Sequence, residues 1–207
     1  MPDVEPYPTA AGVEAAIKDA AKTAAAADPS LTINERIRLE YFNRFLSRVF
    51  SESTDSEWLL KGGTGMLARV PSTRTTLDID LHRDGFTLAQ ALAELRRLAE
   101  IDLGDHFRFV YAGHEDSIGG EEQPYTDGCR VAFDVYIGVK RKTTLYVDLA
   151  VGAGITAPET TSDPASALHL PRLINSAYRA LRHSGGLGSS ILEPRQARAL
   201  LRRLPHR

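Results

Sequence analysis

The sequence predicts an α+β fold in which helices flank a mixed or antiparallel sheet. Two helical stretches near the N-terminus precede short strands with helices between them, and residues 106–152 alternate apolar and polar side chains as β-strands do. With 207 residues, of which 43% are hydrophobic and 25% charged, the chain is long enough to bury one sizeable core.

Composition excludes several protein classes. Cys129 is the only cysteine, which excludes an internal disulfide framework and fits a reducing compartment. No apolar run approaches the ~18 residues of a membrane-spanning helix, and the N-terminus lacks the basic-then-apolar pattern of a signal peptide. These features predict a cytoplasmic protein that does not contact a membrane.

Charge is divided unevenly along the chain. Residues 169–207 hold eight arginines and one acidic residue, so this segment carries +7 and leaves −9 for residues 1–168 in a chain of net charge −2. We therefore predict a domain over residues 1–168, with N-terminal helices at 11–50 and a core at 57–152, followed by a short basic C-terminal segment. That segment fits a nucleic-acid contact, a tail that folds back on the acidic body, or a tail without a role.

Two helices are predicted at the N-terminus. The alanine-rich residues 11–27 favour a helix by intrinsic propensity, and Asp28-Pro29 ends it. From 34 to 50 apolar residues recur at spacings of three and four. The arginines of this second helix predict a solvated opposite side; they are Arg36, Arg38, Arg44 and Arg48.

The next segment predicts strand, glycine turn, helix and strand. Residues 58–61 read as a short buried strand that Gly62-Gly63 ends, and residues 64–70 resume as a helix. Residues 77–81, Leu-Asp-Ile-Asp-Leu, alternate as a strand with the three apolar side chains on one face. Asp78 and Asp80 then share the other face.

A further helix and three strands complete the predicted core. The helix covers 88–103 with Thr87 as its N-cap, and the strands cover 106–113, 129–138 and 143–152. If the turn between the last two strands centres on Arg141, Asp134 pairs near Asp148 and Arg130 shares their face.

Three aspartates form the candidate chemical centre. Alternate residues of a strand lie roughly 7 Å apart, so Asp78 and Asp80 are neighbours, and Asp148 on an adjacent strand would complete a hard oxygen site for Mg²⁺ or Mn²⁺. Two such ions clamp the attacking and leaving oxygens of a phosphoryl displacement. The alternative is the ordinary solvated face of a sheet, which a lone Asp-x-Asp pattern usually marks.

The glycine pair upstream is suited to phosphate binding. Gly62 and Gly63 would let backbone N–H groups approach a triphosphate, and the following helix N-terminus favours negative charge. Lys61, Arg69 and Arg74 would neutralise the phosphates further.

These segments together resemble the AbiEii/MenT toxin nucleotidyltransferases of bacterial toxin–antitoxin systems, over roughly residues 34–178. The resemblance lies in LLKGGTGMLAR, RTTLDIDL and VDLAVG, and less closely in YTDGCRVAF. It implies a fold like that of DNA polymerase β, with the catalytic core at 57–152. The implied catalytic residues are Lys61, Asp78, Asp80 and Asp148, of which the three aspartates hold the metal. The implied nucleotide-binding residues are Gly62, Gly63, Thr64, Arg74 and Arg130.

The resemblance also implies an activity. Such toxins transfer a nucleoside monophosphate from a nucleoside triphosphate (NTP), often a pyrimidine one, to the 3′ end of tRNA, which blocks aminoacylation and growth. The implied partners are tRNA and a cognate antitoxin. Some antitoxins promote phosphorylation near Asp-x-Asp, and Thr76 is the matching hydroxyl here, although an ordinary strand-entry threonine is the alternative. Lys140 and Lys142 would reach RNA phosphates or lie solvated in a turn.

The C-terminal segment departs from the family pattern. No lysine follows Lys142 and no aspartate follows Asp163, where relatives carry lysine-containing elements. The segment is either a shortened or frame-shifted terminus, or the compact end of a member that grips RNA with arginines. Two other functions stay open: transfer to a small molecule or a protein hydroxyl, and a catalytically inactive binding module. Among the remaining residues, His82 follows the Asp-x-Asp strand and could lie at the rim of the site, but an ordinary surface position is favoured, and Cys129 is predicted in the core.

Overall fold

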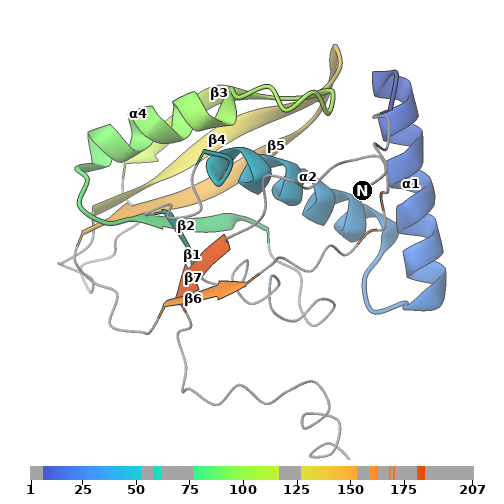
Figure 1. Ribbon diagram of the computed structural model, residues 1–207, viewed down its shortest axis with the longest axis horizontal. Helices are drawn as coiled ribbons and strands as arrows, with labels where there is room; N and C mark the ends of the chain where they lie inside the picture. The colour runs from blue at the N-terminus through green and yellow to red at the C-terminus, as the bar shows by residue number, and fades with distance from the viewer. Residues whose placement is uncertain are drawn as a thin grey trace, which may run out of the picture.

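The computed structural model describes residues 7–52, 58–61, 77–116, 127–152, 159–162, 168, 170 and 181–184. These residues form a seven-stranded mixed sheet in the order β3-β4-β5-β2-β1-β7-β6, with helices packed against it (Figure 1). The helices are α1 (Ala10–Ala27), α2 (Ile33–Val49) and α4 (Leu88–Ala99). The strands are β1 (Trp58–Lys61), β2 (Ile79–Arg83), β3 (Phe107–Asp116), β4 (Asp127–Ile137), β5 (Lys140–Val151), β6 (Glu159–Ser162) and β7 (Leu181–Ser184). The predicted mixed sheet with flanking helices is confirmed.

Each helix begins at a threonine that caps its first turn. The Thr9 hydroxyl accepts from the backbone N–H of Gly12, and Thr32 and Thr87 form reciprocal capping boxes with Glu35 and Gln90. The predicted cap at Thr87 is therefore confirmed. The helix that follows it ends at Ala99, with Glu100 as its C-cap, rather than at residue 103. None of the described helices is long and apolar enough to cross a membrane.

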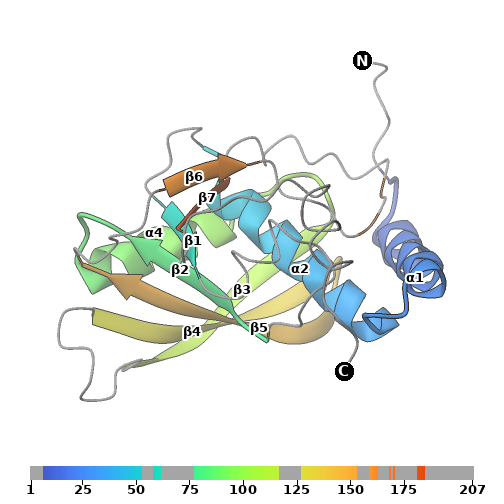
Figure 2. The same ribbon diagram turned by 90° about the horizontal axis from the view of Figure 1, so that it is seen from below.

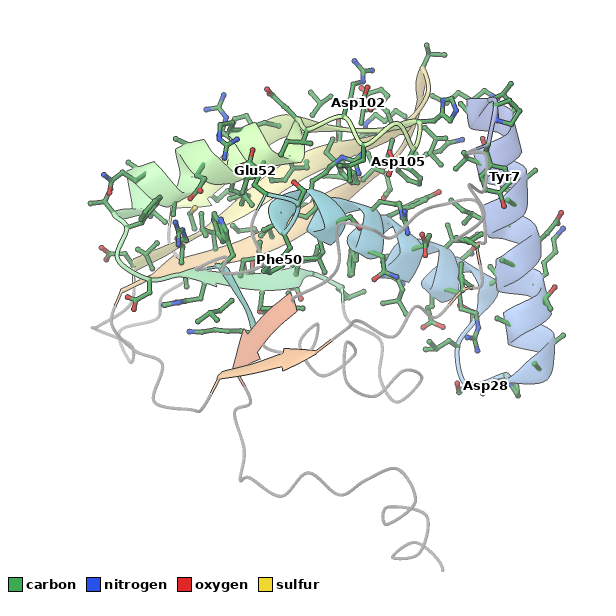
Figure 3. The ribbon with its side chains drawn as sticks, in the orientation of Figure 1. Tyr7, Asp28, Phe50, Glu52, Asp102 and Asp105 are labelled. Carbon is green, nitrogen blue, oxygen red and sulfur yellow. The ribbon has the colours of Figure 1, made fainter. Side chains whose placement is uncertain are left out.

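The core lies between the helices α2 and α4 and one face of the sheet. Phe45 of α2 packs edge-on against Phe109 of β3, with ring centroids 5.2 Å apart, and lies 5.0 Å from Phe133 of β4. Figure 2 shows α2 and α4 above the strands β3, β4 and β5. Side chains crowd the space between the two layers in Figure 3, where Asp28 and Phe50 mark the ends of α1 and α2. The opposite face of these strands carries the polar residues.

The hairpin between β4 and β5 turns at Gly138 and not at Arg141. Ile137 pairs with Lys140, so the loop has two residues, and Gly138 adopts a φ of +59°. A Cβ at this position would also lie 2.8 Å from the Cβ of Ala10 in α1. The prediction that Asp134 pairs near Asp148 is therefore wrong, because the shifted turn places Asp134 opposite Thr144.

Three of the four arginines that the sequence placed on a solvated side of α2 are buried. Arg36, Arg44 and Arg48 expose 4%, 2% and 0% of their surfaces. Each reaches an acid or a carbonyl: Arg44 Nε lies 2.7 Å from Glu40 Oε1, and Arg36 donates to the carbonyls of Leu31 and Asp28. Burial raises the pKa of Glu40, and the charge of Arg44 opposes that rise.

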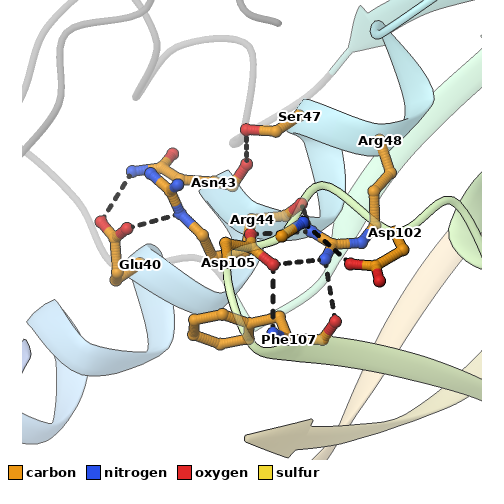
Figure 4. Close-up of polar contacts among 9 residues, drawn as sticks. Glu40, Asn43, Arg44, Ser47, Arg48, Asp102, Asp105 and Phe107 are labelled. Carbon is orange, nitrogen blue, oxygen red and sulfur yellow. Dashed lines mark hydrogen bonds and ion pairs between the residues drawn. The ribbon is translucent and has the colours of Figure 1, made fainter. Parts of the chain in front are cut away.

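Arg48 joins α2 to the start of β3. Its Nη2 donates to Asp105 Oδ1 at 2.7 Å and to the carbonyl of Phe107 at 2.9 Å, while Nη1 donates to the carbonyl of Arg44 at 2.8 Å (Figure 4). The guanidinium also lies over the ring of Phe109. This ion pair holds α2, which covers the core, against the start of β3.

We predict that Arg48→Met lowers the free energy of unfolding by about 3–5 kcal/mol, because it leaves the carboxylate of Asp105 buried without its partner charge. Denaturant unfolding followed by circular dichroism measures the change. Arg97→Met is the matched control, since Arg97 forms an equally short ion pair with Glu52 at 2.7 Å but both side chains are about half exposed. Equal losses for the two variants would contradict the role given to burial.

Candidate active site

The first two carboxylates of the site lie at the start of β2. The strand begins at Ile79, two residues later than predicted, and Leu77 is 68% exposed rather than on the apolar face. Within β2, Ile79 and Leu81 point into the core while Asp80 points to the opposite face. Asp78, immediately before the strand, lies on the side of Asp80.

The third carboxylate reaches this place through a parallel strand pairing. β2 pairs in parallel with β5, and the register sets Asp80 directly opposite Asp148. Asp78, Asp80 and Asp148 each offer a carboxylate oxygen, and these oxygens lie within 4.8 Å of one another. Oxygen atoms on opposite sides of a bound Mg²⁺ are about 4.2 Å apart, so three half-buried carboxylates at this separation suit a hard divalent cation.

Arg130 bridges two of the three carboxylates. β4 pairs with β5 so that Arg130 lies opposite Asp148, which confirms the prediction that the two share a face. Its Nε and Nη2 donate to the two oxygens of Asp148 at 2.7 Å each, and Nη2 also donates to Asp78 at 2.9 Å. These hydrogen bonds and charges raise the pKa of Arg130 above its ordinary value. The guanidinium supplies the positive charge that keeps the carboxylates together.

The site belongs to a row of charges that crosses five strands. The strand registers align Glu115, Arg130, Asp148, Asp80 and Lys61 across β3, β4, β5, β2 and β1. Lys61 is half-buried at the end of this row; burial lowers the pKa of its ammonium, and the charge of Asp80 opposes that change. The row therefore presents two acids between two bases.

His82 is buried beside this row, and its predicted surface position is wrong. It lies two residues after Asp80 on the same face of β2 and is 1% exposed. Its Nε2 donates to the carbonyl of Gly152 at 2.9 Å, which ties β2 to the residue that follows β5. Burial lowers the pKa of His82, and the positive charge of Lys61 lowers it further, so the neutral ring is favoured.

The remaining predicted residues lie outside the described part of the chain. They are Gly62, Gly63, Thr64, Arg74 and Thr76, together with the helix predicted at 64–70. Two neighbours of the site, Glu115 and His82, were not assigned a role from sequence. Only strand pairing reveals Glu115, because its partner Arg130 lies across a loop.

We predict that Arg130→Gln tightens Mn²⁺ binding in the absence of nucleotide by about two- to fivefold, because the guanidinium competes with the cation for Asp148 and Asp78. Titration calorimetry with the metal alone measures the affinity. Arg141→Gln is the matched control: Arg141 donates to Asp134 at 2.7 Å on the same hairpin, away from the three carboxylates. Unchanged or weaker Mn²⁺ binding by Arg130→Gln would show that the two cations do not compete.

Comparison with known proteins agrees with these features. The sequence matches the family described as the nucleotidyl transferase AbiEii toxin of type IV toxin–antitoxin systems over residues 44–177. No curated protein matches. Among solved structures, the nucleotidyltransferase toxin MenT4 from Mycobacterium tuberculosis H37Rv is 18% identical with a TM-score of 0.45, over 86% of this chain and 55% of that chain. JHP933 from Helicobacter pylori is 11% identical with a TM-score of 0.41, over 70% and 52%.

The matches cover different shares of the chain and of the related proteins. The chain spans about half the length of the solved structures. The family match covers more than half of this chain, from Arg44 to Ala177, and includes the three carboxylates and Arg130. The chain therefore belongs to the AbiEii nucleotidyl transferase toxin family of type IV toxin–antitoxin systems.

Proposed function

We propose that this chain transfers a nucleoside monophosphate from a pyrimidine NTP to the 3′ end of tRNA, which blocks aminoacylation and growth. The observation that supports it best is the group of three carboxylate oxygens within 4.8 Å, formed by Asp78, Asp80 and Asp148 inside the segment that matches the family. Both substrates occur in the cytoplasm, where we expect the protein to act.

Each described residue of the site has a role in this proposal. Asp78 and Asp80 would hold a divalent metal, Mg²⁺ or Mn²⁺, on the triphosphate, and Asp148 would complete the site on the acceptor side. When bound, the metal lowers the pKa of the attacking hydroxyl and stabilises charge on the leaving oxygen. The tRNA 3′-oxygen then forms a bond to the α-phosphorus, the bond to pyrophosphate breaks, and the hydroxyl proton leaves to solvent.

Positive groups would stabilise the pyrophosphate that leaves. Lys61 lies opposite Asp80 on β1, directly before the glycine pair. By the family pattern, Gly62, Gly63, Thr64 and Arg74 would contact the phosphates with it. Arg130 would turn from the carboxylates to a phosphate oxygen once the metal neutralises Asp78 and Asp148.

Regulation by an antitoxin forms part of the proposal. A phosphate on Thr76, two residues before Asp78, would add about two negative charges beside the carboxylates and oppose the binding of a triphosphate. We further propose residues 1–168 as the nucleotidyltransferase domain and the basic segment 169–207 as a contact for tRNA.

We expect Asp80→Asn and Asp148→Asn each to lower nucleotide transfer by at least about 100-fold, because a neutral amide is a poor ligand for the metal that activates the reaction. Incubation with labelled NTPs, Mg²⁺ and total RNA measures the transfer. Asp134→Asn is the matched control, since Asp134 shares this face of the sheet and an arginine partner but lies apart from the metal ligands. Thermal unfolding confirms that each variant is folded.

The same labelling assay separates the proposal from its alternatives. Label on a small molecule or a protein hydroxyl, with none on RNA, would overturn the tRNA acceptor. No transfer to any acceptor by folded protein, together with equal growth of cells that express wild type and Asp78→Ala, would identify an inactive binding module.

A further inference from the structure

The face of the sheet that carries the carboxylates continues beyond them along β3, β4 and β5. Three further rows of paired residues follow the charged row on this face. They are Gly113, Ala132 and Tyr146; then Val110, Asp134 and Thr144; and then Arg108, Tyr136 and Arg141. The helices α2 and α4 pack on the opposite face, and α1 meets the hairpin near its tip at Gly138.

Among the described residues, Tyr146 is the aromatic side chain on this face whose row lies next to the carboxylates. It precedes Asp148 by two residues on β5, so the two side chains start roughly 7 Å apart and point to the same side. Tyr146 is 45% exposed on this face of the sheet, and Val110 in the next row is 38% exposed. An exposed aromatic ring beside the reacting centre offers a flat apolar surface where an unpaired base can stack.

Basic side chains flank the second aromatic residue of this face, Tyr136. The guanidinium of Arg108 lies 4.7 Å from the ring centroid of Tyr136, and both residues are in the row furthest from Asp148. Arg141 completes that row, donating to Asp134 and Thr144 at 2.7 Å. Arg108 and Arg141 are exposed there, and Asp134 is the one acid among the described residues of these three rows. Aromatic rings among cations are the surface that single-stranded nucleic acids bind.

We propose that this face, defined as Tyr146, Tyr136, Arg108 and Arg141, binds the single-stranded 3′ end of the RNA acceptor, with Tyr146 stacking on a terminal base. The inference rests on the proposed function. An in-line displacement needs the acceptor and the leaving pyrophosphate on opposite sides of the α-phosphorus. In the sheet, β2 with Asp80 lies between β1 and β5. The proposed phosphate-binding turn follows β1 in the sequence, whereas Tyr146 lies on β5, on the other side of β2. The acceptor end therefore reaches Asp148 over Tyr146.

The test compares matched variants by fluorescence anisotropy with a labelled single-stranded RNA oligonucleotide, in Mg²⁺. Tyr146→Ala weakens RNA binding by about 10-fold, and Tyr146→Phe, which keeps the ring, restores it. Arg108→Gln weakens binding and lowers its salt dependence. Arg96→Gln has no effect, although Arg96 lies 4.2 Å from the ring of Tyr111 in the same way, because it projects from α4 on the other side of the sheet.

Binding of NTP, measured separately by calorimetry, distinguishes the outcomes. Unchanged NTP affinity in Tyr146→Ala together with weaker RNA binding supports the inference, whether or not the RNA becomes labelled in the transfer assay. Weaker NTP binding with unchanged RNA binding would overturn it, since the ring would then serve the incoming nucleotide. Equal effects of Arg108→Gln and Arg96→Gln would also overturn it, even if transfer to tRNA is observed.

Discussion

The parallel pairing of β2 with β5 is the constraint on which the site depends. It joins segments 68 residues apart and sets Asp80 opposite Asp148, and the antiparallel pairing of β4 then brings Arg130 to the same place. A slip of one residue in either pairing would turn Asp148 into the core and Val147 toward solvent. The fully buried side chains of Ile79, Val147 and Leu149 prevent such a slip. The apolar core therefore positions the polar face.

Local patterns in the sequence predicted most of the elements and all three members of the carboxylate group. The helix over residues 34–50 follows from apolar spacing, the cap at Thr87 from its neighbours, and the pairing of Asp78 with Asp80 from alternation in one strand. Burial of the α2 arginines could not be predicted in this way, because Asp105, the partner of Arg48, lies 57 residues further along the chain. The turn at Gly138 was missed because the basic residues Lys140, Arg141 and Lys142 suggested a turn centred on Arg141.

Charge balance explains why polar groups are tolerated on both sides of this sheet. On the helix side, Arg44 and Arg48 are buried, and each lies within 2.7 Å of a carboxylate. On the open side, charges of opposite sign alternate except at Asp148 and Asp80, which are adjacent acids. Negative charge is concentrated in this row at that pair, and a divalent cation would have its most favourable electrostatic interaction there.

The contact of Arg130 with Asp148 and Asp78 has a consequence for folding. Where no positive side chain lies among a group of carboxylates, they repel one another, and folding of the site then depends on a bound cation. Here Arg130 supplies a positive charge from within the chain, because its guanidinium is paired with Asp148 and Asp78. We therefore expect the fold to depend less on a bound cation than it would at an acidic site without such an arginine.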